Sequence, residues 1–234
     1  MNYALNCANL CLLSYIDNLN YSNCKFINNL ETDTQCYIFY YLNEIYIVFR
    51  GTNSITDWKH DIDIRTIKPY KNNIKIHNGF YKQYESIKDI IYNSIYNIKN
   101  IKLHILGHSL GGALAYICAV DIFYNYNNPN ISVFTIGSPR PGNNIFKDFF
   151  NKYIKKSLRY KNKGDIVTKL PLRSEFKHVH KSISINKGKL YKEKINKKII
   201  NRIVNLICTI DLKNMILNHS VSEYINNIKL LEII

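Results

Sequence analysis

The sequence predicts an α/β fold in which helices cover both faces of a mainly parallel sheet. Short runs rich in β-branched and aromatic residues alternate with longer segments of helical periodicity, an order typical of parallel sheets. The chain has 234 residues, of which 46% are hydrophobic, so it can bury a sizeable core. It contains no internal repeat and no linker rich in Gly, Ser or Pro. We therefore expect a single domain over residues 1–234.

The first part of the chain predicts one helix and one hairpin. A first core helix is expected within residues 1–16, whose apolar side chains near helical spacing are Ala4, Leu5, Ala8, Leu12 and Tyr15. Two β-rich runs, 37–41 and 45–49, follow each other closely and indicate a hairpin. Residues 62–67 and 74–76 are weaker strand candidates.

From residue 80 onward, helices and strands alternate. Helical periodicity or Ala-rich composition predicts helices over residues 80–98, 110–123, 145–154 and 221–228. Compact apolar runs predict strands over residues 102–106, 131–136 and 158–160. Polarity alternates along residues 176–185, so His178 and His180 are expected on one face of a further strand.

The compartment is expected to be cytoplasmic. No run of about 18 uncharged apolar residues exists that could span a membrane. The N-terminus has neither a basic n-region nor a small-residue cleavage site, so no signal peptide is expected. The six cysteines lack the C-x-x-C spacing of metal sites, and buried free thiols are the preferred interpretation.

The positive charge is concentrated in one segment. The chain has 32 Lys and Arg against 17 Asp and Glu, a net charge of +15, and residues 147–202 hold 18 of these basic residues against 4 acidic ones. Residues 192–210 would form a helix with apolar and basic faces, which suits either an anionic membrane surface or ordinary packing on the core. No zinc or helix-turn-helix signature accompanies the charge, so nucleic-acid binding is not expected.

Residues 107–111 read Gly-His-Ser-Leu-Gly and match the G-x-S-x-G pattern. An apolar strand precedes the pattern and an Ala-rich helix follows it, which is the setting of a nucleophile elbow in an α/β-hydrolase fold. In such a turn Ser109 projects at the C-terminal edge of the sheet, where the helix N-terminus favours developing negative charge. The alternative is an ordinary Gly-rich turn with an idle serine.

A nucleophilic serine needs a base and an acid, which follow it along an α/β-hydrolase chain in the order Asp or Glu, then His. Asp165 comes just after the strand at 158–160, in a Gly-Asp turn where a triad acid belongs, whereas Asp121 and Asp148 fall on predicted helices.

Three histidines follow the serine in sequence. His219 is the preferred base because it lies in a loop before the last predicted helix, from which it can reach Ser109, and His178 is the alternative. His108 is too close to Ser109 in sequence to fold back as its base, and we expect it to pack beneath the elbow.

These residues resemble the class 3 lipases, the fungal-type triacylglycerol lipase family of α/β-hydrolases. Seven motifs in the family's order carry the resemblance, at residues 48–52, 57–61, 77–80, 107–115, 137–142, 162–171 and 219–224. The resemblance extends over roughly residues 4–228, although residues 183–217 align with nothing in the family.

The resemblance implies a role for each matching residue. Ser109 would be the nucleophile, His219 the base and Asp165 the residue that orients the base. Thr52, through its N–H and hydroxyl, and Leu110, through its N–H, would form the oxyanion hole. Asp57 and Trp58 would lie on or near a mobile lid.

The implied activity is a serine hydrolase of triacylglycerol lipase type that cleaves lipid esters at an interface through an acyl-enzyme, with no metal or organic cofactor. A phospholipase A1 and an esterase of soluble esters use the same chemistry and remain alternatives. An inactive lipase-like interaction protein is a third, which the presence of all three triad residues disfavours. The segment 147–202 could in addition draw the protein to an anionic membrane surface.

Overall fold

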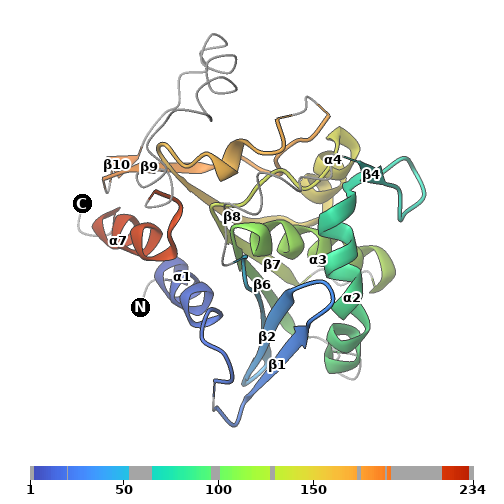
Figure 1. Ribbon diagram of the computed structural model, residues 1–234, viewed down its shortest axis with the longest axis horizontal. Coiled ribbons are helices and arrows are strands. Elements are labelled where there is room, and N and C mark those ends of the chain that lie inside the picture. Colours follow the sequence, from blue (N-terminus) through green and yellow to red (C-terminus); the bar gives the residue numbers. More distant parts are fainter. Residues whose placement is uncertain are drawn as a thin grey trace.

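The computed structural model describes residues 3–19, 21–52, 65–95, 101–126, 130–172, 175–187, 189–190 and 218–231. Eight strands form one sheet in the order β1-β2-β3-β6-β7-β8-β9-β10 (Figure 1). They are β1 (Cys24–Asn29), β2 (Thr34–Tyr41), β3 (Glu44–Phe49), β6 (Lys102–His108), β7 (Ile131–Ile136), β8 (Lys156–Asn162), β9 (Ile183–Asn186) and β10 (Lys189–Leu190). Two short strands, β4 (Thr66–Ile67) and β5 (Ile76–His77), pair separately.

The centre of the sheet is parallel, and its two margins are antiparallel. Strands β3, β6, β7, β8 and β9 pair in parallel. The pairs β1–β2, β2–β3 and β9–β10 are antiparallel. Parallel strands need crossovers, and helices supply those that join β3, β6, β7 and β8. The predicted mainly parallel sheet with helices on both faces is therefore confirmed.

The helices divide between the two faces of the sheet. Helices α2 (Asn78–Ile95), α3 (Leu110–Tyr126) and α4 (Asn144–Tyr153) share one hydrophobic cluster, which includes Ile47 and Phe49 of β3. Helices α1 (Tyr3–Leu13) and α7 (Val221–Leu231) share the other cluster, which includes Val48. Figure 1 shows α1 and α7 side by side. Because successive strand residues point to opposite faces, a single apolar strand such as β3 supplies both clusters.

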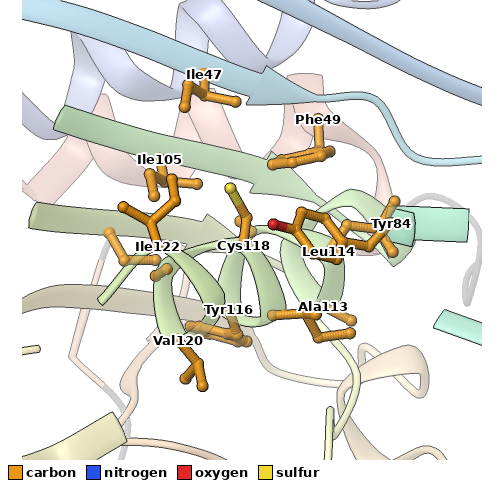
Figure 2. Packing of buried hydrophobic residues seen from close by; sticks show 14 of the residues in the cluster. Ile47, Phe49, Tyr84, Ile105, Ala113, Leu114, Tyr116, Cys118, Val120 and Ile122 are labelled. Atoms are coloured by element: carbon orange, nitrogen blue, oxygen red, sulfur yellow. The ribbon is translucent and has the colours of Figure 1, made fainter. Parts of the chain in front are cut away.

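Helix α3 is buried on all sides near its start, which fixes the turn that precedes it. Figure 2 shows Cys118 and Ile122 between α3 and the strands that carry Ile47 and Ile105. All four of these side chains are at most 1% exposed. A helix held this firmly cannot move the residues at its N-terminus relative to the sheet.

Two expectations from the sequence are wrong in detail, and one strand was not expected. Leu12 does not belong to the core: it is 41% exposed, and Cys7 and Cys11 take the buried positions of α1 instead. Residues 176–182 form no named strand, since β9 begins only at Ile183, and their one ladder contact is an isolated bridge at Lys177. Strand β1 was not expected, because its Lys and Asn residues hide the alternation of polarity.

The five cysteines that the structure describes are free thiols; Cys7, Cys11, Cys36 and Cys118 are buried, as expected, whereas Cys24 is only half-buried. Among the helices in the described ranges, none combines the length and apolar character needed to cross a bilayer. The predicted amphipathic helix at 192–210 lies outside the described residues.

A buried carboxylate joins α2 to α3. Asp121 of α3 is fully buried and accepts hydrogen bonds from the hydroxyls of Tyr70 (2.6 Å), Tyr84 (2.8 Å) and Tyr92. The Lys88 ammonium lies 3.4 Å away. Burial and the nearby carboxylate raise the pKa of these three hydroxyls, which therefore remain protonated donors.

Replacement of Asp121 by valine is expected to lower the free energy of unfolding by about 3 kcal/mol, because three hydroxyls and one ammonium lose a buried acceptor. Urea unfolding followed by circular dichroism measures the change. Asp148→Ala is the control, since its side chain is 69% exposed and its ion pair with Lys147 should contribute less than about 1 kcal/mol. Equal effects of the two substitutions would contradict a stabilising role for Asp121.

Candidate active site

Ser109 occupies a strained turn between β6 and α3. Its φ is +57°, in the left-handed region that non-glycine residues rarely adopt. The turn depends on close backbone contacts: a Cβ on Gly107 would lie 2.2 Å from the Gly111 carbonyl oxygen. The Ser109 N–H donates to the Ile136 carbonyl (3.1 Å) and thereby ties the turn to β7. This is the geometry expected of a nucleophile elbow.

A continuous chain of hydrogen bonds connects Ser109, His219 and Asp165. The Ser109 hydroxyl lies 2.7 Å from His219 Nε2. His219 Nδ1 lies 3.0 Å and 2.9 Å from the two Asp165 carboxylate oxygens. A carboxylate only accepts, so Nδ1 carries the proton and Nε2 is left to accept from the serine hydroxyl. The three residues are 4%, 2% and 1% exposed, respectively.

Further donors hold the Asp165 carboxylate in place. The Val167 N–H donates to Oδ1 (2.9 Å), and the Tyr224 hydroxyl donates to Oδ2 (2.6 Å). Burial, together with the carboxylate, raises the pKa of Tyr224 well above its usual value, so its hydroxyl remains a donor. Tyr224 was not predicted from the sequence. The available signal was a tyrosine on the otherwise apolar face of the last predicted helix.

The other two histidines that follow Ser109 in sequence bond to backbone carbonyls. Nε2 of His178 donates to Thr168 O (2.6 Å), and Nε2 of His180 donates to Ile154 O (2.9 Å). Burial lowers the pKa of His178 well below its usual value. The structure thus brings His219, and not the alternative His178, to Ser109. His219 itself lies in a helical turn that ends at Ser220, where a loop was expected.

The segment proposed for the oxyanion hole borders the nucleophile. A Cβ on Gly51 would lie 2.9 Å from Ser109 Cβ and 2.8 Å from the His108 carbonyl oxygen, so the backbone just before Thr52 touches the elbow. Leu110 is the first residue of α3, where backbone N–H groups have no acceptor within the helix. The lid candidates Asp57 and Trp58 lie outside the described residues.

His108 does more than pack beneath the elbow. One ring nitrogen lies 2.6 Å from the Tyr15 hydroxyl and the other lies 2.7 Å from the His219 carbonyl oxygen. The sequence pattern gave no sign of either contact, because Tyr15 and His219 lie far from His108 along the chain.

The described residues contain no group of three or more His, Cys, Asp or Glu side chains arranged to hold a metal ion.

Comparison with known families agrees with this geometry. The model of the class 3 lipase family matches residues 46–175, which is more than half of the chain. The chain belongs to the class 3 lipase family. The match includes the elbow and the segments of Thr52 and Asp165.

Individual relatives extend the family assignment. A lipase of Rhizomucor miehei is 32% identical to this class 3 family member over 135 residues, which cover 54% of this chain and 37% of that protein. The solved structure of Rhizomucor miehei triacylglyceride lipase has a TM-score of 0.68 at 26% identity and covers 77% of this chain and 78% of that one. A triacylglycerol lipase whose catalytic centre is described as a serine protease triad has a TM-score of 0.62 at 29% identity, covering 69% and 65%.

The chain spans between about a third and about half of the length of the curated relatives that it matches. The structural match is broader, since it covers 78% of the solved Rhizomucor chain. The α/β-hydrolase fold predicted from the elbow is confirmed by these structures.

Proposed function

We propose that this class 3 family member hydrolyses carboxylic ester bonds of lipids in the manner of a triacylglycerol lipase. One observation carries the proposal: the buried hydrogen-bonded chain from the Ser109 hydroxyl through His219 to Asp165, with the serine in a strained elbow. Relatives that are named as lipases, one of them with a serine protease triad, support it.

The first half of the proposed reaction forms an acyl-enzyme. Ser109 Oγ attacks the ester carbonyl carbon while His219 Nε2 accepts the hydroxyl proton. Asp165 accepts from Nδ1 and stabilises the imidazolium that results. When the tetrahedral intermediate collapses, the ester C–O bond breaks and the proton on Nε2 passes to the departing alcohol.

The second half releases the fatty acid. His219 accepts a proton from water as the water oxygen attacks the acyl carbon, and the proton then returns to Ser109 Oγ as the acyl–enzyme bond breaks. The Leu110 N–H, together with the N–H and hydroxyl of Thr52, would stabilise the oxyanion in both halves. Such donors act on charge that develops in the transition state, and therefore they raise kcat.

The proposal is tested with a panel of emulsified triacylglycerol, phospholipid vesicles and a soluble p-nitrophenyl ester. We expect turnover of acylglycerol by the intact chain, together with stoichiometric labelling of Ser109 by an alkyl phosphonate. Turnover of phospholipid alone would indicate a phospholipase A1. Neither turnover nor labelling would favour the inactive, lipase-like interaction protein.

Replacement of Thr52 by valine is expected to lower kcat roughly 10–10³-fold with little change in KM, because the lost hydroxyl would stabilise the oxyanion and not the bound ester. Initial rates over a range of substrate concentrations separate the two parameters. Thr32→Val removes a hydroxyl from the β1–β2 turn and serves as the control. An effect on KM alone would place Thr52 in substrate binding.

We further propose that residues 147–202 draw the protein to anionic lipid. Support comes from the exposed lysines of the described part of this segment, which are Lys152, Lys155, Lys156, Lys163, Lys181, Lys187 and Lys189. Each lysine that reaches the headgroups contributes about 1 kcal/mol at low salt, an attraction that screening removes.

Binding to anionic vesicles is accordingly expected to fall steeply between about 0.1 M and 1 M salt, where the Debye length shrinks from about 10 Å to about 3 Å. Co-sedimentation of the protein with the vesicles measures it. Charge reversal of Lys155 and Lys156 should weaken binding, whereas reversal of Lys25 and Lys82, which are exposed outside the segment, should have less effect. Equal losses would show that only the net charge matters.

A further inference from the structure

Two side chains outside the triad connect its base to the loop proposed for the oxyanion hole. Tyr15 follows helix α1, and its hydroxyl lies 2.6 Å from Nδ1 of His108. Nε2 of His108 lies 2.7 Å from the backbone carbonyl oxygen of His219. His108 also precedes Ser109 directly in sequence, so one residue contacts the base and adjoins the nucleophile.

The chemistry of the partners fixes the protons of this network. A carbonyl oxygen only accepts, so His108 Nε2 must carry a hydrogen and donate it to His219. Burial lowers the pKa of His108 well below its usual value, and the ring is therefore neutral. Nδ1 is then unprotonated and accepts from the Tyr15 hydroxyl. Burial raises the pKa of Tyr15, so this hydroxyl keeps its proton.

The network continues into the oxyanion segment. The backbone of Gly51 lies directly against the Tyr15 hydroxyl, because a Cβ on Gly51 would lie 2.5 Å from this oxygen. The two hydrogen bonds thus point in one direction, from Tyr15 through His108 to the backbone of His219.

We propose that Tyr15 and His108 are positioning residues that hold the backbone of His219, and with it the imidazole, in register with Ser109 and with the Gly51–Thr52 segment. The proposal rests on the proposed function, since it concerns the geometry of the same reaction. Misplacement of a reacting group by about 1 Å can cost about 100-fold in rate, so a backbone contact of this kind affects catalysis without touching substrate.

The residue types at both positions fit this role. Phenylalanine at position 15 would leave His108 Nδ1 without its hydrogen-bond donor. The His219 carbonyl still requires the proton on Nε2, so the tautomer stays the same, but the ring of His108 is then held at one nitrogen only and can turn. A turn of the ring would shift the backbone of His219 and move the base relative to Ser109.

The kinetic test compares four variants. Tyr15→Phe and His108→Leu should each lower kcat roughly 10–100-fold, with KM within about twofold of the wild type. His108→Gln should recover much of the loss, because its amide can donate to His219 and accept from Tyr15 with the same spacing as the ring. Titration of active sites with a phosphonate separates a slower site from a smaller fraction of folded protein.

Tyr3→Phe is the matched control. Tyr3 also belongs to the N-terminal region, and its hydroxyl also lies near a histidine nitrogen, 2.9 Å from Nδ1 of His104. Tyr3 has no contact with the triad or the elbow among the described interactions, so kcat should not change. If the hydroxyls of Tyr15 and Tyr3 contributed only to stability, both substitutions would lower the free energy of unfolding and leave kcat per active site unchanged.

A spectroscopic test is independent of turnover. Nitrogen-15 spectra of histidine-labelled protein should show His108 as the neutral tautomer with the proton on Nε2 between about pH 5 and pH 8. In Tyr15→Phe the Nδ1 resonance of His108, which loses its hydrogen-bond donor, and the His219 resonances should shift, and neither change should occur in Tyr3→Phe.

The outcomes separate the two proposals. Absence of ester turnover and of phosphonate labelling in the wild type would end the proposed function, and the spectra would still test the network. A proton on Nδ1 of His108, or wild-type kcat per active site in both Tyr15→Phe and His108→Leu, would overturn the positioning role.

Discussion

Replacement of Ser109 by alanine is expected to lower kcat for ester hydrolysis by about 10³-fold or more and to leave the fold intact. The substitution removes the only atom that forms the acyl bond, and the rate that remains depends on the oxyanion donors alone. The side chain is small and makes one side-chain hydrogen bond, to His219, among the described contacts. Alanine also relieves no backbone strain, because the turn keeps the same φ.

The matched control is Ser132→Ala. Ser132 is a buried serine near the N-terminal end of β7, at the opposite end of the sheet from Ser109, and its hydroxyl lies 2.8 Å from Nδ1 of His104. It should retain activity. Hydrolysis that persisted in Ser109→Ala at the rate of the Ser132→Ala control would exclude an acyl-enzyme on Ser109.

Replacement of Asp165 by asparagine is expected to lower kcat by about 10⁴-fold with a smaller effect on KM. The carboxylate accepts from the Val167 N–H on one oxygen and from the Tyr224 hydroxyl on the other, in addition to His219. Asparagine must present its NH₂ group to one of these donors or to His219. If it faces His219, the imidazole takes its proton on Nε2 and can no longer accept from Ser109.

Tyr224→Phe provides a graded comparison, since it removes one neutral donor from Asp165 and should cost only about 5-fold. Steady-state kinetics at saturating substrate gives both values. His178→Ala tests the alternative base and should leave kcat within a few-fold, because His178 bonds to Thr168 O. Loss of turnover in His178→Ala but not in His219→Ala would refute the assignment of the base.

Much of the site could be predicted because its signals are local. The Gly-His-Ser-Leu-Gly turn lies between an apolar strand and an Ala-rich helix, and only such a turn allows the close backbone contacts at Gly107. Asp165 was predictable for a similar reason: it follows β8, which lies two strands from the elbow strand β6 in the same parallel sheet, whose C-terminal ends meet at one edge.

Local signals failed where burial or chain geometry depends on distant neighbours. The periodicity of α1 favoured Leu12 as a core residue, yet the helix packs through Cys7 and Cys11. Alternating polarity at residues 176–182 indicated a strand, but His178 and His180 bond to carbonyls of other segments instead of continuing a sheet. In both cases tertiary contacts overrode a weak periodic preference.

The sequence by itself determined the fold class, the elbow and the order of Ser109, Asp165 and His219 along the chain. Only the tertiary structure decided which histidine reaches the serine, and it alone revealed Tyr224 behind Asp165 and the pair of Tyr15 and His108 behind His219. Tyr224 lies 59 residues from Asp165 in the sequence, and Tyr15 lies 93 residues from His108. Periodicity specifies which face of a helix is buried, whereas a hydrogen bond between distant segments forms only where the packing of α1 and α7 on the sheet brings its donor and acceptor together.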